Sequence, residues 1–249
     1  MTEVYWLEQR ETDVPPENDW LSPAEVLRLA GLRFAKRRAD WRLGRWTAKR
    51  ALAICLNLGD HHQALAKLEI GVAPSGAPEV ILGQQPAGAS ISLSHCSGRA
   101  VCAVAPAEAA LGCDVERIEA RSHAFLADYF SPEEQALVAH SADPSGLLTL
   151  LWSGKESALK ALHAGLRLDT RSVIVNPSGS SSDLNSWQGL RVRHEKDQVF
   201  QGWWRRDHDF VHTLVSAPPA DPPIRVPIGN QVATRAPCIM DTTLGSMLR

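Results

Sequence analysis

The sequence feature that most constrains the fold is an acidic segment, GCDVE, at residues 112–116. Apolar residues precede this segment and then alternate with its two acids, a pattern typical of a half-buried β-strand. Side chains two residues apart on a strand leave the same face, roughly 6–7 Å from each other. Asp114 and Glu116 are therefore predicted to form a pair of carboxylates on one side of a sheet.

A second motif, WSGKESALKA at residues 152–161, has the spacing of a helix. An α-helix turns about 100° per residue, so one stripe of this helix holds Trp152, Glu156, Lys160 and His163. If this helix meets the acidic strand, three carboxylates converge, and they repel one another unless a cation holds them. Such an all-oxygen set suits Mg²⁺. The alternative for Glu156 and Lys160 is a solvated i, i+4 ion pair.

Lys155 is the unusual residue of this helix. Its helical angle places it within the leucine stripe, where an unpaired charge is costly. We therefore expect its ammonium to leave the edge of the core toward an anion.

Taken together, the Gly-x-Asp-x-Glu strand and the Trp-x-x-Lys-Glu-x-x-x-Lys-Ala helix resemble motifs of the 4′-phosphopantetheinyl transferases. Two further segments match. ISLSH at residues 91–95 is similar to the family's Ser-His strand, and RRADWRLGR at residues 37–45 is similar to its arginine-rich helix. The four segments have the family's order and spacing. The chain length resembles the pseudo-dimeric, broad-specificity subfamily of the surfactin- and enterobactin-synthase-activating type.

The resemblance implies an enzyme that moves the 4′-phosphopantetheine group of coenzyme A to a serine of an acyl or peptidyl carrier protein. The reaction uses Mg²⁺, releases 3′,5′-ADP and serves secondary metabolite biosynthesis. The implied fold is α+β, a monomer of two similar α+β halves with the active site at their interface. Residues 1–110 would be the N-terminal half with the basic helix, 111–217 the C-terminal half with the metal and catalytic motifs, and 218–249 a proline-rich, irregular tail.

The resemblance also implies roles for single residues. The metal ligands would be Asp114, Glu116 and Glu156. The catalytic residues would be Glu156, as the base for the carrier serine, and Lys160, which stabilises charge on the pyrophosphate. The residues expected to bind coenzyme A are Arg37, Arg38, Arg45, Ser94, His95, Lys155 and Lys160.

Two positions depart from the family pattern. Ala77 stands where relatives often carry lysine, and Cys96 where they often carry serine or threonine. One expected cation and one hydroxyl–phosphate contact are therefore missing, which leaves an inactive family member as an alternative. Glu134 matches an acidic position of the family, but its place in a helix capping box accounts for it.

The alternative from another class is a nucleic-acid-binding module. Basic residues cluster between residues 33 and 50, with Trp41 and Trp46 interleaved, as such modules require. The whole chain opposes this interpretation, because its net charge is −2 and its pI is about 6.5.

The remaining composition indicates a cytoplasmic protein. The five cysteines are odd in number and form no C-x-x-C pair, so neither a disulfide framework nor a zinc site is expected. No apolar run approaches the ~20 residues of a membrane span, and the N-terminus lacks the pattern of a signal peptide. No metal-ligand pattern is seen for His61, His62, His208 and His212.

Two capping boxes, Ser22-Pro23-Ala24-Glu25 and Ser131-Pro132-Glu133-Glu134, each predict a helix. Two longer helices are expected. One runs from residue 33 or 34 toward 58, and the other, which carries the 152–161 motif, ends near Gly165. Strands are expected at 3–7, 67–72, 79–82, 90–95, 99–105, the acidic segment, 172–175, 189–193, 198–204 and 210–215. The order of helices and then strands occurs twice, which hints at an internal duplication.

Overall fold

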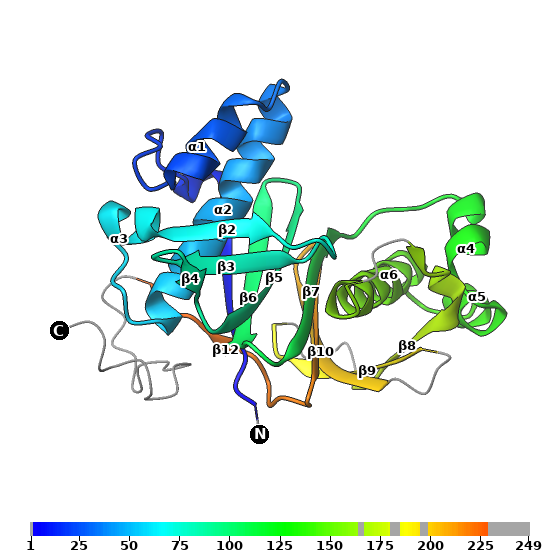
Figure 1. Ribbon diagram of the computed structural model, residues 1–249. Helices are drawn as coiled ribbons and strands as arrows, with labels where there is room; N and C mark the ends of the chain where they lie inside the picture. The colour runs from blue at the N-terminus through cyan, green and yellow to red at the C-terminus, as the bar shows by residue number, and fades with distance from the viewer. Residues whose placement is uncertain (1, 164–166, 180–184, 195–198, 229–249) are drawn as a thin grey trace.

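The computed structural model describes residues 2–163, 167–179, 185–194 and 199–228. After the first strand, a group of helices is followed by a group of strands, and this order occurs twice along the chain, which confirms the mixed α+β class. Figure 1 shows two parts side by side, joined along β5, β6 and β7. None of the described helices combines the length and the apolar character needed to cross a membrane.

In the first part, one long helix packs on a sheet. The strands are β1 (Tyr5–Arg10), β2 (Leu68–Val72), β3 (Pro78–Leu82), β4 (Gln85–Pro86), β5 (Ala89–Cys96) and β6 (Arg99–Pro106). The helices are η1 (Glu11–Asp13), α1 (Pro23–Ala30), α2 (Ala35–Cys55) and α3 (His62–Lys67). β6 pairs antiparallel with β1 and β5, while β2, β3 and β4 form a separate sheet. α2 covers β1, β5 and β6 and buries apolar residues such as Trp46 and Leu52.

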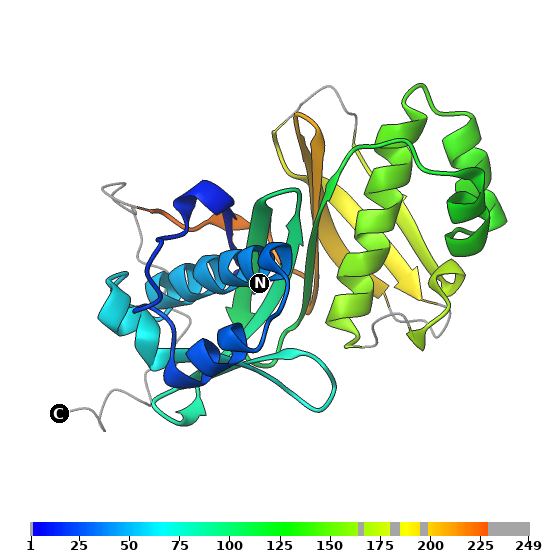
Figure 2. The same cartoon turned by 90° about the horizontal axis from the view of Figure 1, so that it is seen from above.

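The second part has one five-stranded antiparallel sheet in the order β7-β11-β10-β9-β8. Its strands are β7 (Ala110–Arg117), β8 (Val173–Pro177), β9 (Gln188–His194), β10 (Val199–Asp207) and β11 (Phe210–Ala217). Its helices are α4 (His123–Tyr129), α5 (Pro132–Ala139), α6 (Pro144–Ala161) and η3 (Thr170–Ser172). Seen from above, α2 and α6 lie on opposite sides of the central strands (Figure 2).

The contact between α6 and β7 depends on a glycine. A Cβ atom built on Gly112 would lie 1.8 Å from the carbonyl oxygen of Ser157. Any larger residue would push the helix off the strand. The absence of a side chain therefore lets α6 approach the strand that carries Asp114 and Glu116.

A buried ion pair follows each capping box. Glu134 accepts the amide of Val175 at 3.2 Å and pairs with Lys155 at 2.7 Å. In the first part Glu25 accepts the amide of Ile70 at 3.2 Å and pairs with Lys49. In each part a glutamate thus ties the start of a short helix to the long helix and to a strand.

The chain after residue 217 differs from the predicted irregular tail. β12 (Ile224–Arg225) pairs in parallel with β1, and Val226 is 1% exposed within the core cluster beneath α2. An edge strand tolerates neighbouring prolines, because one side needs no ladder hydrogen bonds. Residues 229–249 of the predicted tail lie outside the described residues.

Candidate active site

The structure brings Lys160 of α6 onto Asp114 of β7. The Lys160 ammonium donates to Asp114 Oδ1 at 2.8 Å and to the carbonyl oxygen of Cys113 at 3.0 Å. Ser94 of β5 donates to the same carboxylate oxygen at 2.6 Å. Although burial opposes it, the Asp114 carboxylate raises the pKa of Lys160 above its ordinary value. Asp114 is therefore the point at which β5, β7 and α6 meet.

Glu116 and Glu156 lie within the electrostatic influence of Asp114. Burial, followed by the Asp114 charge, raises the pKa of Glu116 to about 7, against the effect of Arg121, which donates to Glu116 at 3.1 Å. Burial, followed by Asp114, also raises the pKa of Glu156, and Lys160 opposes the shift. Burial and the Asp114 charge therefore both oppose ionisation of these two glutamates.

The donor set fits Mg²⁺ in its chemistry. Oδ2 of Asp114 is buried and has no hydrogen-bond partner among the described residues, so it is available as a ligand. The predicted ligands Asp114, Glu116 and Glu156 do not, however, place three ligand atoms within 4.8 Å of one another. Mg²⁺ commonly keeps several waters and takes only one or two carboxylates. An ion here would accordingly use few direct protein ligands.

Lys155 does not leave the core toward a ligand, contrary to the expectation from sequence. Its side chain is fully buried, pairs with Glu134 and donates to the carbonyl oxygens of Thr170 and Val173. The expectation is wrong because a charge within an apolar stripe can also be satisfied inside the core, where Glu134 provides the partner. Glu134 also forms the capping box at the start of α5. Among the described residues, its polar contacts are with Ser131, Lys155 and Val175, and none is with the carboxylate site.

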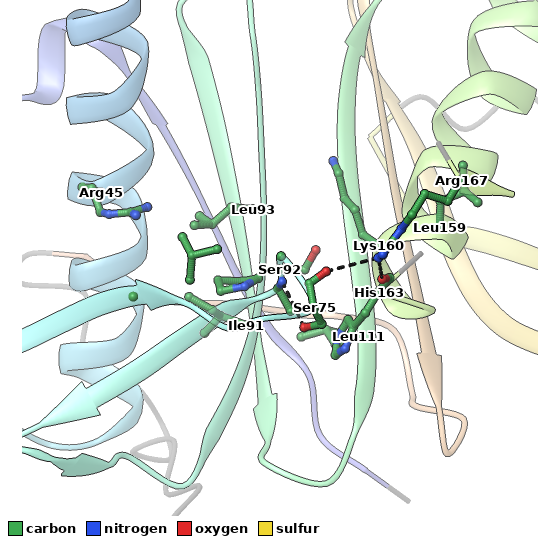
Figure 3. A pocket seen from close by; sticks show the side chains of 15 residues that line it. Arg45, Ser75, Ile91, Ser92, Leu93, Leu111, Leu159, Lys160, His163 and Arg167 are labelled. Carbon is green, nitrogen blue, oxygen red and sulfur yellow. Dashed lines mark hydrogen bonds between the residues drawn. The ribbon is translucent and has the colours of Figure 1, made fainter. Parts of the chain in front are cut away.

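A pocket of about 710 Å³ opens next to Lys160. Figure 3 shows Arg45 on one side of it and Lys160, His163 and Arg167 on the other, with serine and apolar side chains between them. The residues that line it include four basic side chains and no carboxylate. Arg167, which follows α6 in the sequence, donates to the carbonyl oxygen of Ser75 at 3.4 Å and so contacts the β2–β3 turn. Such a lining suits a polyanion, and we call this pocket the basic pocket.

The basic helix contributes to this pocket at one residue only among those described. Arg45 lines it and donates to the carbonyl oxygen of Ile70 at 3.1 Å. Arg37 and Arg38 are exposed in the first turns of α2 and do not line it. Arg37 instead lines a separate pocket with Phe34, Trp41 and other residues. Arg37 and Arg38 are therefore not beside the pocket that Arg45 lines.

The Ser-His strand divides between different surfaces. Ser94 contacts Asp114, whereas Ser92, two residues earlier, lines the basic pocket. Ser92 was given no role from the sequence. His95 is exposed and lines the same separate pocket as Arg37. His163 and Arg167 also line the basic pocket and were given no site role from the sequence. The helical spacing did place His163 in one stripe with Lys160, which was a signal for it.

His212 has a carboxylate environment that the sequence did not predict. Among the described residues, Glu8, Asp207 and His212 are the one set of three that offers ligand atoms within 4.8 Å of each other. Arg99 donates to both carboxylates at 3.0 Å, which neutralises the group without an ion. Burial, helped by Arg205 and Arg99, lowers the pKa of His212 to about 3.

Residues 110–215 match the model of a family described as the 4′-phosphopantetheinyl transferase superfamily. The match covers less than half of the chain. The matched segment runs from the start of β7 into β11 and thus contains Asp114, Glu116, Glu156 and Lys160. A comparison with curated proteins found no match.

Two solved structures are similar to parts of the chain. Holo-(acyl-carrier-protein) synthase of Helicobacter pylori, in complex with coenzyme A, is 19% identical with a TM-score of 0.34, over 42% of this chain and 99% of that one. The holo-(acyl-carrier-protein) synthase of Thermotoga maritima is 21% identical with a TM-score of 0.33, over 43% of this chain and 61% of that one.

Proposed function

We propose that the chain transfers the 4′-phosphopantetheine group of coenzyme A to a serine of an acyl or peptidyl carrier protein. The observation that carries this proposal is the position of Lys160, which belongs both to the basic pocket and to the carboxylate site around Asp114. A pyrophosphate bound at that junction has cations on one side and metal-ligating acids on the other. The match of residues 110–215 to the family model supports the same activity.

The basic pocket is the proposed site for coenzyme A. Coenzyme A carries a pyrophosphate and a 3′-phosphate, and the lining offers Arg45, Lys160 and Arg167 to such groups. Arginine presents a planar fork that matches phosphate oxygens, while lysine acts as a point charge. The apolar part of the lining, which includes Ile91, Leu93 and Leu111, suits the less polar parts of the ligand.

In the proposed reaction, Glu156 accepts the proton of the carrier serine. Burial raises its pKa, which makes the carboxylate a stronger base than an ordinary glutamate. The serine oxygen forms a bond to the β-phosphorus as the phosphoanhydride bond breaks, and the electron pair leaves with 3′,5′-ADP. Lys160 offsets the charge that builds on the pyrophosphate. Mg²⁺, when bound to Asp114 with Glu116 or Glu156, supplies further positive charge to the phosphate oxygens.

We also propose that the chain is a pseudo-dimer of the broad-specificity type, active as a monomer in the cytoplasm. The order β1-β6-β5 in one sheet corresponds to β7-β11-β10 in the other. The capping-box ion pairs Glu25–Lys49 and Glu134–Lys155 occupy equivalent places in the two parts. Two such halves would bring their interface to β5 and β7, where Ser94 meets Asp114.

The direct test is mass spectrometry of an apo carrier protein incubated with coenzyme A, Mg²⁺ and the protein. The carrier should gain the mass of one phosphopantetheine group, and a carrier whose serine is replaced by alanine should gain nothing. Asp114→Asn preserves the size of the side chain but removes its charge, so it should abolish the gain. Full transfer in excess chelator would contradict the metal assignment, and no transfer to any carrier would contradict the proposed activity.

A further inference from the structure

A second large pocket lies where strands of the two parts meet. Its volume is about 630 Å³, and its lining comes from β1, β10 and β12 together with neighbouring residues. The charged and aromatic residues that line it include Trp6, Glu8, Arg10, Arg205, Asp207 and Arg225. We call it the β1–β10 pocket. No described residue lines both this pocket and the basic pocket, so a ligand here would occupy a site of its own.

The carboxylates of the β1–β10 pocket already have partners. Arg99 donates to Glu8 Oε1 and to Asp207 Oδ2, at 3.0 Å in each case. Asp13 accepts the backbone amide of Arg10 at 2.7 Å. Because Arg99 already offsets the charge of Glu8 and Asp207, these acids do not favour a cation as the ligand of the pocket.

Two arginines of the pocket, in contrast, have no carboxylate partner. The guanidinium carbon of Arg205 lies 4.4 Å from the centre of the Trp6 ring and 5.5 Å from that of the Trp187 ring. The guanidinium carbon of Arg225 lies 5.8 Å from the Trp6 ring. Within the described part of the chain neither arginine forms an ion pair, and Nε of Arg205 is buried without a hydrogen-bond partner. The same indole thus holds two positive charges that no described acid pairs directly.

Trp6 holds these arginines in a geometry that suits an oxyanion. Trp6 is 5% exposed and packs edge-on against Trp187, so its ring is fixed. A guanidinium over an aromatic ring uses its face for that contact and keeps the N–H groups along its edge for hydrogen bonds. That edge matches two oxygens of a carboxylate or a phosphate. Nε1 of Trp6 is also buried and has no hydrogen-bond partner among the described residues, and a donor of this kind is stabilised by an added acceptor.

We propose that the β1–β10 pocket binds a small oxyanion, a phosphate or a carboxylate, between Arg205 and Arg225. Arg205 belongs to the five-stranded sheet and Arg225 to the edge strand beside β1, so a ligand between them joins the two sheets. Burial lowers the pKa of Arg205 and the Arg225 charge adds to this effect, while the acids of the pocket oppose it. A bound oxyanion would offset the repulsion between the two arginines. The inference goes beyond the proposed function, because it uses none of the residues assigned to transfer.

The test is isothermal titration calorimetry of the full chain in a buffer free of phosphate and carboxylate, with inorganic phosphate and citrate as separate probes. At least one probe should bind saturably with a Kd below about 1 mM, and the tighter of the two identifies the kind of oxyanion. Arg225→Gln removes a charge at an exposed position and should weaken binding about tenfold, because charge-assisted hydrogen bonds are lost. Arg205→Gln should do the same. Arg191→Gln is the matched control and should keep the Kd, because Arg191 is exposed on β9 of the same sheet as Arg205 but lies outside the pocket.

The basic pocket is another place where an oxyanion can bind, and Arg45→Ala separates the two sites. Arg45→Ala should keep the binding that Arg205→Gln and Arg225→Gln weaken, because Arg45 lines the basic pocket alone. If Arg45→Ala removes the binding and the other two variants keep it, the oxyanion occupies the basic pocket and the inference is overturned. It is also overturned if neither probe binds saturably up to about 10 mM.

Thermal unfolding provides a readout that does not depend on transfer activity. A ligand that binds only the folded protein raises its Tm, so the probe should raise the Tm of the unaltered protein and of Arg191→Gln. At the same concentration it should raise the Tm of Arg225→Gln less, and an equal rise would overturn the inference. If Arg205→Gln fails to fold, since Arg205 is half-buried, the exposed Arg225 decides alone. A protein that shows these shifts but transfers nothing to any carrier would contradict the proposed function and support this inference.

Discussion

Lys160 and Asp114 form an ion pair of 2.8 Å across the contact between α6 and β7. The pair depends on Gly112, because the close approach of α6 to β7 leaves no room for a Cβ there. Lys160 thereby holds a position at which it offsets part of the charge of the acids and also faces the basic pocket. Lys160 therefore contacts both the proposed metal ligand Asp114 and the proposed coenzyme A pocket.

Lys160→Ala should lower kcat by roughly 10²–10³-fold, because it removes a group that stabilises charge developing in the transition state. The requirement for Mg²⁺ should persist, since the carboxylates stay in place. Lys67→Ala, at an exposed lysine on the other part of the chain, is the control and should keep wild-type kcat. Wild-type turnover of Lys160→Ala would remove the residue from the mechanism.

Arg45→Ala should raise the KM for coenzyme A, because Arg45 lines the basic pocket. Arg38→Ala, on the same helix but outside the pocket, should leave that constant unchanged and so serves as the comparison. Repeating the titration with 3′-dephospho-coenzyme A identifies the contact: if Arg45 binds the 3′-phosphate, the effect of the substitution should shrink. Equal effects of both substitutions on coenzyme A would contradict the placement.

The sequence could not predict which arginine of the basic helix lines the pocket, as the contrast between Arg45 and Arg37 shows. A clustered motif names a helix but not the end of it that meets a ligand. Eight residues at about 1.5 Å each separate Arg37 from Arg45 by about 12 Å along the helix axis. Among the described residues of α2, only Arg45 lines the pocket, because the β2–β3 turn and the end of α6 form other walls of it. The positions of these two segments cannot be predicted from the sequence of α2.

Local patterns predicted much of the fold because they act over few residues. The capping boxes at Ser22 and Ser131 placed the starts of α1 and α5 correctly, and strand alternation placed β7. Lys155 was misplaced because its partner Glu134 lies on another helix. The short helices α3 and α4 were missed, since neither is long enough to show a clear period.

Truncation after Ala217 should destabilise the protein, because it removes β12 and the buried Val226. Val226→Ala alone should cost roughly 1.5–2.5 kcal/mol, the value for two buried methylene-sized groups plus a small cavity. Urea denaturation measures both. Truncation after Ile228 keeps β12 and is the comparison. A protein cut after Ala217 with unchanged stability would show that β12 and Val226 contribute little.

The stability of the protein should fall in acid partly through His212. Burial holds its folded pKa at about 3, against an unfolded value of 6.5. Between these values the unfolded chain binds the extra proton, so stability declines as the pH falls from about 6.5 toward 3. At pH 5 the loss is on the order of 2 kcal/mol.

The measurement for His212 is denaturant unfolding at pH 7.5 and at pH 5. His212→Gln cannot titrate, so the difference in unfolding free energy between the two pH values should be smaller in this variant than in the unaltered protein. The groups around His212, which are Glu8, Asp207, Arg99 and Arg205, remain in both proteins and cancel in the comparison. An identical pH dependence would show that His212 is not the group responsible.

Glu156→Gln separates the role of a base from that of an ion pair. The amide keeps the size of the side chain but loses its charge and basicity, so it should lower kcat and weaken Mg²⁺ binding. In the unaltered protein, the rate should rise with pH through the raised pKa of Glu156, provided that chemistry limits the rate. In Glu156→Gln that rise should flatten. Glu133→Gln is the control, because Glu133 is an exposed helical glutamate whose pKa is lowered by local hydrogen bonds rather than raised. If Glu156→Gln keeps wild-type kcat, pH profile and Mg²⁺ affinity, Glu156 has no part in the reaction, and its charge serves only as the neighbour of Lys160 on α6.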